Sequence, residues 1–192
     1  MLDTLKGARR LASSLGAAAL LAGVIAAPVS AAGTVTQQIT AGGLTASVSD
    51  LNLPSVAYRN AARDVSGTMV ISADDSRGLP LGWSVTVQGS AFVYSGAAGG
   101  TNIPATAFAL TSAQQPVHIA GQAVSLTAAT GPQIPPEIIY GSLAVPIKTI
   151  RATAAYGAGT YSQDLVVTLT IPGQSQVGTY TGTLTTTISA TP

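Results

Sequence analysis

The sequence predicts an all-β protein, a single antiparallel β-sandwich with Greek-key or immunoglobulin-like topology that follows an N-terminal signal-peptide helix. Three observations predict this fold class. Beyond residue 32, apolar residues recur with a period of two, as in strands whose alternate side chains face a core. Gly, Pro, Asn and Ser interrupt the pattern at short intervals, which is typical of sandwiches and barrels. No long stretch of the remaining chain has the period of an amphipathic helix.

The first 31 residues have the layout of a secretory signal peptide. Three basic residues precede position 11, and an almost wholly apolar run then extends to Val29, where small residues follow. Polar residues and a proline interrupt the run, which disfavours a retained membrane-spanning helix. We therefore expect residues 1–31 to be removed and residues 32–192 to form one secreted domain with no membrane span.

The expected mature chain carries almost no net charge, because five basic and six acidic side chains remain after residues 1–31 are removed. The charged fraction of the whole chain is 8%, so Thr, Ser, Gln and Gly must cover much of the surface. Such a surface lacks the electrostatic footprint of nucleic-acid binding and argues against tight binding to polyanions. The sequence has no cysteine, which excludes disulfides, a thiolate nucleophile and a cysteine-based metal site.

The segments with strand-like alternation follow one another along the whole expected domain. They are 34–40, 44–51, 66–73, 82–89, 105–111, 116–120, 122–127, 143–154, 160–171 and 179–190. Two stretches between them, Ser95–Pro104 and Ala128–Ser142, are rich in Gly, Ala or Pro and are expected to be irregular.

The last two of these segments, 160–171 and 179–190, show the alternation most clearly. The odd positions of the first and the even positions of the second form the more apolar face. The odd positions of the second carry only Thr and Ser, and β-branched Thr favours a strand with one solvated face. The short loop at 172–176 predicts that the two strands form an antiparallel pair.

The segment Trp83-Ser84-Val85 contains the only tryptophan, and the end of the chain repeats a related spacing. There, Tyr180, Leu184 and Ile188 lie on one face of a strand that ends close to a proline. This arrangement resembles the WxL domain. That family carries one Trp-x-Leu motif inside the domain and a second near the C-terminus, within a Tyr-x-x-x-Leu/Ile-Thr-Trp-x-Leu segment.

The resemblance covers roughly residues 35–192 and has two departures. Val85 stands at the Leu position of the first motif, and Thr186 stands at the Trp position of the second. The resemblance implies non-covalent association with peptidoglycan or another wall glycan, together with other surface proteins, at the cell wall or cell surface. The candidate wall-binding or motif residues that it implies are Trp83, Val85, Tyr180, Leu184, Thr186 and Ile188.

Trp83 admits two interpretations. Its ring could stack on a sugar of the wall, or it could pack in the core beside Val85 and Val87. The alternation favours the core. Tyr161 and Tyr180 have the same ambiguity. The tyrosines next to Gly- or Pro-rich loops are better candidates for exposed contacts: Tyr94, Tyr140 and Tyr156.

The titratable residues offer little for catalysis or metal binding. His118 is the only histidine, and a triad or most zinc sites would need it beside a nucleophile or other ligands. Asp74 and Asp75 could offer oxygens to calcium, but neighbours on a strand point to opposite faces. Asp75 more simply caps a turn or forms an exposed ion pair with Arg77, which would add little stability. We expect no enzymatic activity, no catalytic residue, no metal and no cofactor.

The leading functional hypothesis is a wall-associated binding or scaffold module. The alternative is a self-assembling, fimbria-like or fibre-forming surface subunit, because the run Val166–Ile171 is uncharged and strongly β-forming. The last strand could pair with a neighbouring molecule if it lies at an edge. A third hypothesis, a small ligand-binding domain, requires a concave pocket lined by Trp83 or by the tyrosines.

Overall fold

The computed structural model describes residues 36–124 and 131–192, so the expected signal peptide lies outside the described residues. The chain divides into two units, 1–38 and 39–192, and every described strand belongs to the second. Within the described ranges, no helix is long and apolar enough to cross a membrane. The elements are β1 (Leu44–Val48), β2 (Arg63–Asp75), β3 (Trp83–Gly89), β4 (Val93–Ser95), the 3₁₀ helix η1 (Ala105–Ala107), β5 (Phe108–Ala113), β6 (Val117–Gly121), β7 (Gly141–Ser142), β8 (Ile147–Ala152), β9 (Gly159–Ile171), β10 (Thr179–Thr181) and β11 (Leu184–Ser189).

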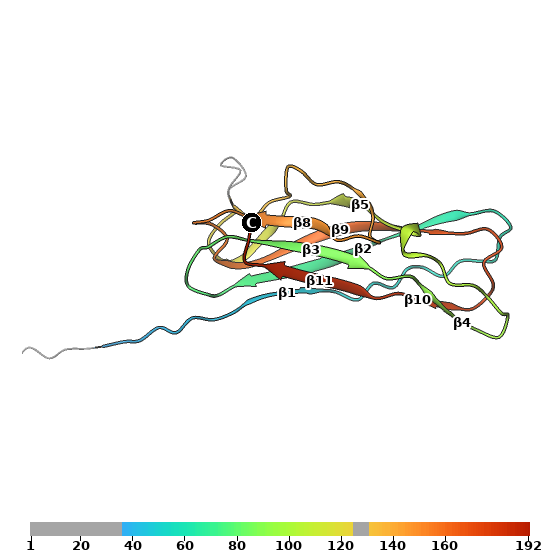
Figure 1. The fold of residues 1–192 in the computed structure, drawn as a ribbon, viewed down its shortest axis with the longest axis horizontal. Helices are drawn as coiled ribbons and strands as arrows, with labels where there is room; N and C mark the ends of the chain where they lie inside the picture. Colours follow the sequence, from blue (N-terminus) through green and yellow to red (C-terminus); the bar gives the residue numbers. More distant parts are fainter. Residues whose placement is uncertain (1–35, 125–130) are drawn as a thin grey trace, which may run out of the picture. The chain divides into compact units, whose positions relative to one another are not determined.

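The strands form antiparallel sheets, which confirms the all-β antiparallel part of the predicted fold class (Figure 1). The largest sheet has the order β1-β2-β9-β5-β7, and β6 also pairs with β9. A three-stranded sheet has the order β11-β3-β8, and β4 pairs with β10 in a small separate ribbon. Figure 1 shows this ribbon beyond the ends of β3 and β11, on the side away from the C-terminus.

One buried cluster takes alternate side chains from both larger sheets, as the period of two requires. Ile71 of β2 and Val85 of β3 are fully buried in it. The rings of Trp83 and Tyr161, one from each sheet, lie 5.9 Å apart. In β9, the odd positions from Tyr161 to Leu169 are buried, which confirms the predicted core face. Because both sheets bury side chains in one cluster, neither has a core of its own.

Some predicted strands are wrong or displaced. Residues 36–40 and 122–124 form no strand, and the rest of the segments 34–40 and 122–127 lies outside the described residues. Ile39 is 91% exposed, so the apolar alternation of its segment is not buried against a sheet. Two short strands, β4 and β7, lie in or next to the stretches expected to be irregular. The sequence did not predict them, because elements of two or three residues are too short to show a period.

The predicted antiparallel pair between the last two segments is also wrong. β9 pairs with β2 along one edge and with β5 and β6 along the other. The segment 179–190 forms two strands, β10 and β11, which pair with β4 and β3. Alternation specifies which face of a strand is buried but not which strand lies beside it. The run Val166–Ile171 is therefore part of an interior strand, whereas β11 ends the three-stranded sheet.

Candidate functional site

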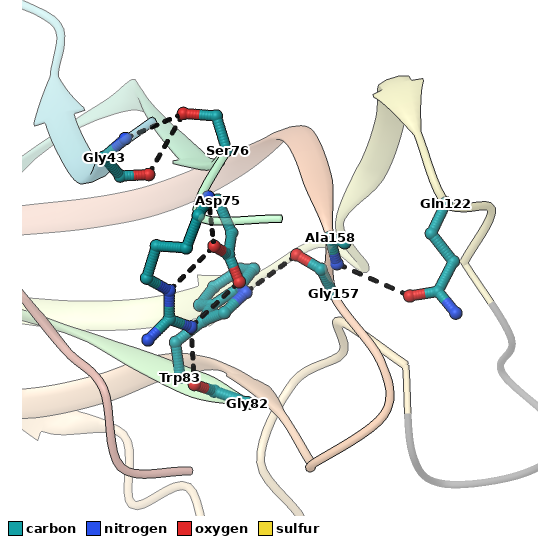
Figure 2. A network of polar contacts seen from close by, with 9 residues as sticks. Gly43, Asp75, Ser76, Gly82, Trp83, Gln122, Gly157 and Ala158 are labelled. Atoms are coloured by element: carbon teal, nitrogen blue, oxygen red, sulfur yellow. Dashed lines mark hydrogen bonds and ion pairs between the residues drawn. The ribbon is translucent and has the colours of Figure 1, made fainter. Parts of the chain in front are cut away.

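The first candidate motif, Trp83-Ser84-Val85, lies inside the core. Trp83 is fully buried, and its Nε1 donates a hydrogen bond of 2.9 Å to the carbonyl oxygen of Gly157 (Figure 2). Val85 is fully buried on the same face of β3. The core interpretation of Trp83 is therefore confirmed. A ring without exposed surface cannot stack on a sugar, so this residue contributes to stability in the described structure.

An ion pair next to Trp83 is more buried than we predicted from the sequence. Asp75 is 3% exposed, and its two carboxylate oxygens accept hydrogen bonds from Arg77 Nε at 2.8 Å and a terminal guanidinium nitrogen at 2.9 Å. The same guanidinium group donates to the carbonyl oxygen of Gly82 at 3.0 Å. The prediction of an exposed, weak pair is wrong, because β2 carries the carboxylate into the core at its last residue.

This ion pair also influences the acid–base properties of its neighbours. The hydrogen bond that Arg77 donates to Asp75 raises the pKa of Arg77, although burial opposes the shift. Burial, with a smaller contribution from the charge of Asp75, raises the pKa of Tyr161 to about 12. The Tyr161 hydroxyl donates to the carbonyl oxygen of Gln122 at 2.6 Å. Asp74, one position earlier on β2, instead accepts a 2.6 Å hydrogen bond from Thr160 Oγ1.

The last residues of the sequence cover this region. Ser84 Oγ donates a hydrogen bond of 2.8 Å to the carbonyl oxygen of Thr191. Ile188 and Thr186 of β11 are half-buried and lie opposite Val85 and Val87 of β3. Ile188 packs against the core, whereas Thr186 Oγ1 is buried without a hydrogen-bond partner among the described residues. The two motif segments thus pack together rather than forming an open site.

An open cavity of about 520 Å³ lies elsewhere in the domain, and we call it the Tyr58 pocket. Segments 51–63 and 169–184 supply most of its lining. Arg63, which lines it, begins β2, whereas Asp75 beside the tryptophan ends the same strand of 13 residues. At roughly 3.3 Å per residue, the two regions are separated by about 40 Å along β2. The pocket and the tryptophan motif are therefore spatially distinct.

The first wall of the Tyr58 pocket is the connection between β1 and β2, which is held against the sheet. Leu51 and Leu53 pack on the backbone of Gly67, where a Cβ atom would lie 2.8 and 2.9 Å from their side chains. The guanidinium group of Arg63 donates to the carbonyl oxygen of Ala57. These contacts fix a loop whose Tyr58 is 52% exposed. The loop can therefore present an aromatic ring in a defined position.

The second wall is the segment that runs from β9 to β11. The Tyr180 hydroxyl donates to the carbonyl oxygen of Gln176 at 2.9 Å, and the Tyr94 hydroxyl donates to Val177 at 2.9 Å. The rings of Tyr94 and Tyr180 lie 5.2 Å apart. Glycine at position 178 is required, because a Cβ atom there would collide with the Tyr94 ring. Packed tyrosines thus hold this wall rigid.

The charge of the Tyr58 pocket differs from that of the whole expected domain. Among the described residues, its lining includes Arg59 and Arg63 but no acidic side chain. Asp64, the next residue along β2, accepts a 2.6 Å hydrogen bond from Thr170 Oγ1 and does not line the pocket. Arg63 Nε is buried and has no hydrogen-bond partner in the described part of the chain. The pocket combines positive charge, aromatic rings and hydroxyl groups, a combination suited to polar ligands with an apolar face.

A second cavity of about 380 Å³ lies near β7 and β8, and we call it the Tyr140 pocket. Its lining includes Ile139, Tyr140 and Val145, with Glu137 and Lys148 as the charged residues. Its charges are thus balanced, in contrast to the Tyr58 pocket. Tyr140 is 43% exposed, as we expected of a tyrosine in this loop.

The acidic residues and the histidine do not form a chemical site in the ranges 36–124 and 131–192. No three His, Cys, Asp or Glu side chains in these ranges come together in a way that could hold a metal ion. His118 is exposed on β6, and its Nε2 lies 3.0 Å from the carbonyl oxygen of Gly121. Its closest described ring neighbour is Tyr161, at 6.0 Å between ring centroids.

Only two of the six candidate residues from the sequence, Tyr180 and Leu184, line the Tyr58 pocket. The sequence analysis missed Tyr58, Arg59 and Arg63. One signal could have found them: two of the five basic residues of the expected mature chain lie four positions apart, next to an aromatic residue. The loop has no recognisable motif, so only the folded chain brings it opposite Tyr180.

Fold and cavities together define a class of protein, a small all-β domain with an open, aromatic pocket. Comparison with protein families then matches residues 35–192 to the WxL domain surface cell wall-binding family, and the chain belongs to that family. It is therefore a cell-surface protein with a wall-binding domain. Comparison with curated proteins and with solved structures gives no match.

Proposed function

We propose that the protein attaches non-covalently to peptidoglycan and that the Tyr58 pocket is the binding site. The observation that carries this proposal is the lining of the pocket, where exposed Tyr58 lies in the same cavity as Tyr180 and two arginines. Aromatic rings pack against the C–H faces of sugars, and guanidinium groups donate hydrogen bonds to their oxygens. The fully buried Trp83 offers neither contact.

The proposed binding involves no catalysis. Hydrolysis of a glycan normally requires two carboxylic side chains flanking the scissile bond, and the lining of the Tyr58 pocket contains none. The domain would hold wall material without changing it. Association with other surface proteins, which the family resemblance implies, stays a prediction.

The finer description of the fold belongs to the same proposal. We propose that the domain is a β-sandwich with Greek-key connections, preceded by a cleaved signal peptide at residues 1–31. The connections from β2 to β3 and from β8 to β9 both cross from one sheet to the other, which supports this topology. The shared buried cluster supports two facing layers.

Co-sedimentation with purified peptidoglycan tests the function. We expect the wild-type protein to pellet with peptidoglycan and to remain bound in moderate salt, because the expected mature chain carries little net charge. Tyr58→Ser removes an exposed ring from the pocket, and we expect it to weaken binding about tenfold, as expected for the loss of a central aromatic contact.

Tyr140→Ser is the matched control. It removes a tyrosine of similar exposure, 43% against 52%, from the other cavity. We expect this variant to bind as the wild type does. Equal loss in both variants, or retention in both, would contradict the assignment of the pocket. Failure of the wild type to pellet would contradict peptidoglycan binding itself.

A further inference from the structure

We infer that the Tyr58 pocket selects a carboxylate next to an apolar or pyranose face, and this inference rests on the proposed function. The ligand would place its carboxylate against Arg59 and Arg63 and its apolar face against Tyr58 and Tyr180. Peptidoglycan offers such a group in two places, on the lactyl ether of those muramic acid residues that carry no peptide and at the free C-terminus of its peptides.

The distribution of charge is the first argument. The expected mature chain has more acidic than basic residues, yet the lining of the Tyr58 pocket contains two arginines and no acid. The charge of the pocket is thus opposite in sign to that of the domain around it. The Tyr140 pocket, in contrast, pairs Lys148 with Glu137 in its lining. A neutral glycan alone would gain little from this concentration of positive charge.

The arginines themselves are the second argument. Arg77 is held by Asp75, and Arg151 lies 3.4 Å from Glu137. Arg63 makes no ion pair with a described carboxylate; it donates to a backbone carbonyl, and its buried Nε is unpartnered among the described residues. A guanidinium group that is partly removed from water binds carboxylates with charge-assisted hydrogen bonds, which are stronger than those between neutral groups.

The arrangement of the two walls is the third argument. Arg59 is exposed, and its carbonyl oxygen accepts a 2.9 Å hydrogen bond from the backbone nitrogen of Gln174 in the opposite wall. This contact holds the positively charged loop near the wall that carries Tyr180. Charge and aromatic surface are therefore available to one ligand at the same time, without closure of the loops.

Chemical-shift titration of the isotope-labelled protein tests the inference. The first pair of probes is N-acetylmuramic acid and its methyl ester, and the second is D-alanyl-D-alanine and its C-terminal amide. In each pair the neutral derivative lacks the negative charge and otherwise differs only in the small group that replaces the carboxylate oxygen. We expect at least one acid to bind about fivefold or more tightly than its neutral derivative, with shifts in residues 51–63 and 175–184. The pair that shows the difference identifies the source of the carboxylate.

Arg59→Gln and Lys148→Gln form a matched pair of variants, because each removes one positive charge from an exposed or half-exposed position. We expect Arg59→Gln to abolish most of the difference between acid and neutral derivative, and Lys148→Gln to preserve it. The inference is overturned if acids and neutral derivatives bind equally, or if glycerol phosphate binds more tightly than either acid. Wall binding that survives such a result would leave the proposed function intact, since a neutral sugar would then be the ligand.

Discussion

At the residue scale, the ion pair between Asp75 and Arg77 is more buried than the pair between Glu137 and Arg151. The spacing of two positions between Asp75 and Arg77 predicts a local ion pair, and the structure contains it. Burial could not be predicted, because it depends on how the two sheets pack around the end of β2, and both contribute to the same buried cluster. A charge pair in such a position is weak evidence for stability as a whole, but loss of one partner is costly.

Arg77→Ala is expected to lower the free energy of unfolding by about 3–5 kcal/mol, because it leaves the buried Asp75 carboxylate without its partner. Glu137→Gln disrupts the more exposed pair with Arg151 and should change stability by less than about 1 kcal/mol. Urea unfolding of the two variants measures the contrast. Equal and small effects would show that Asp75 remains well solvated.

The raised pKa of Tyr161 predicts that the stability of the domain depends on pH in the alkaline range. The folded pKa of this residue is about 12, whereas the ordinary value is 10.0. Between these values the unfolded chain loses the phenolic proton and the folded chain keeps it. The stabilisation is therefore complete below pH 10 and is lost as the pH rises towards 12, by an amount on the order of 2 kcal/mol.

Tyr161→Phe provides the control for this titration. It removes the hydrogen bond to Gln122 and should lower stability at pH 8 by about 1 kcal/mol. From pH 8 to pH 11.5 its stability should fall less than that of the wild type, as followed by denaturant unfolding. Identical declines in both proteins would assign the alkaline sensitivity to other groups.

At the scale of elements, the connection between β8 and β9 links the local conformation of the chain to the tryptophan. Gly157 has a φ angle of +85°, and a Cβ atom there would lie 2.6 Å from Ala152 Cβ and 2.7 Å from Trp83 Nε1. The position therefore requires glycine for two reasons, a left-handed conformation and a lack of space. Nothing in the sequence pattern around Gly157 indicated its contact with Trp83.

Gly157→Ala should destabilise the domain by about 2 kcal/mol more than Gly78→Ala. Gly78 also has a positive φ angle, +73°, but a Cβ atom there would meet nothing within 4 Å. Thermal unfolding followed by the emission of Trp83, the only tryptophan, measures both variants. If both alanines cost the same, the backbone of Gly157 does not lie as close to Ala152 and the indole of Trp83 as described.

The buried faces of the strands could be predicted from the sequence, but the pairing of the strands could not. Alternation identified the buried face of β9 and the half-buried face of β11, because side chains must alternate across a strand. It did not identify their partners, since a strand of either sheet satisfies the same pattern. The break between β10 and β11 was also missed, because the alternation continues through it without a change of phase.

At the scale of the whole molecule, the sequence revealed the family but not the location of the candidate site. Trp83 and Val85 are fully buried at the end of β2 that contains Asp75, whereas Tyr180 and Leu184 line the Tyr58 pocket. The Tyr58 pocket lies at the other end of that strand, and the loop that supplies Tyr58, Arg59 and Arg63 has no recognisable motif. Stability and proposed binding are therefore assigned to different regions, and substitutions in one should leave the other largely unaffected.

Hydrogen exchange of the protein with and without soluble peptidoglycan fragments tests this division most directly. We predict slower exchange on binding in residues 51–63 and 175–184, which line the Tyr58 pocket, and no change in residues 135–148 around the Tyr140 pocket. The amides around Trp83 should exchange slowly in both states, because they lie in the core. Protection confined to residues 135–148, or to the segment around Trp83, would contradict the account.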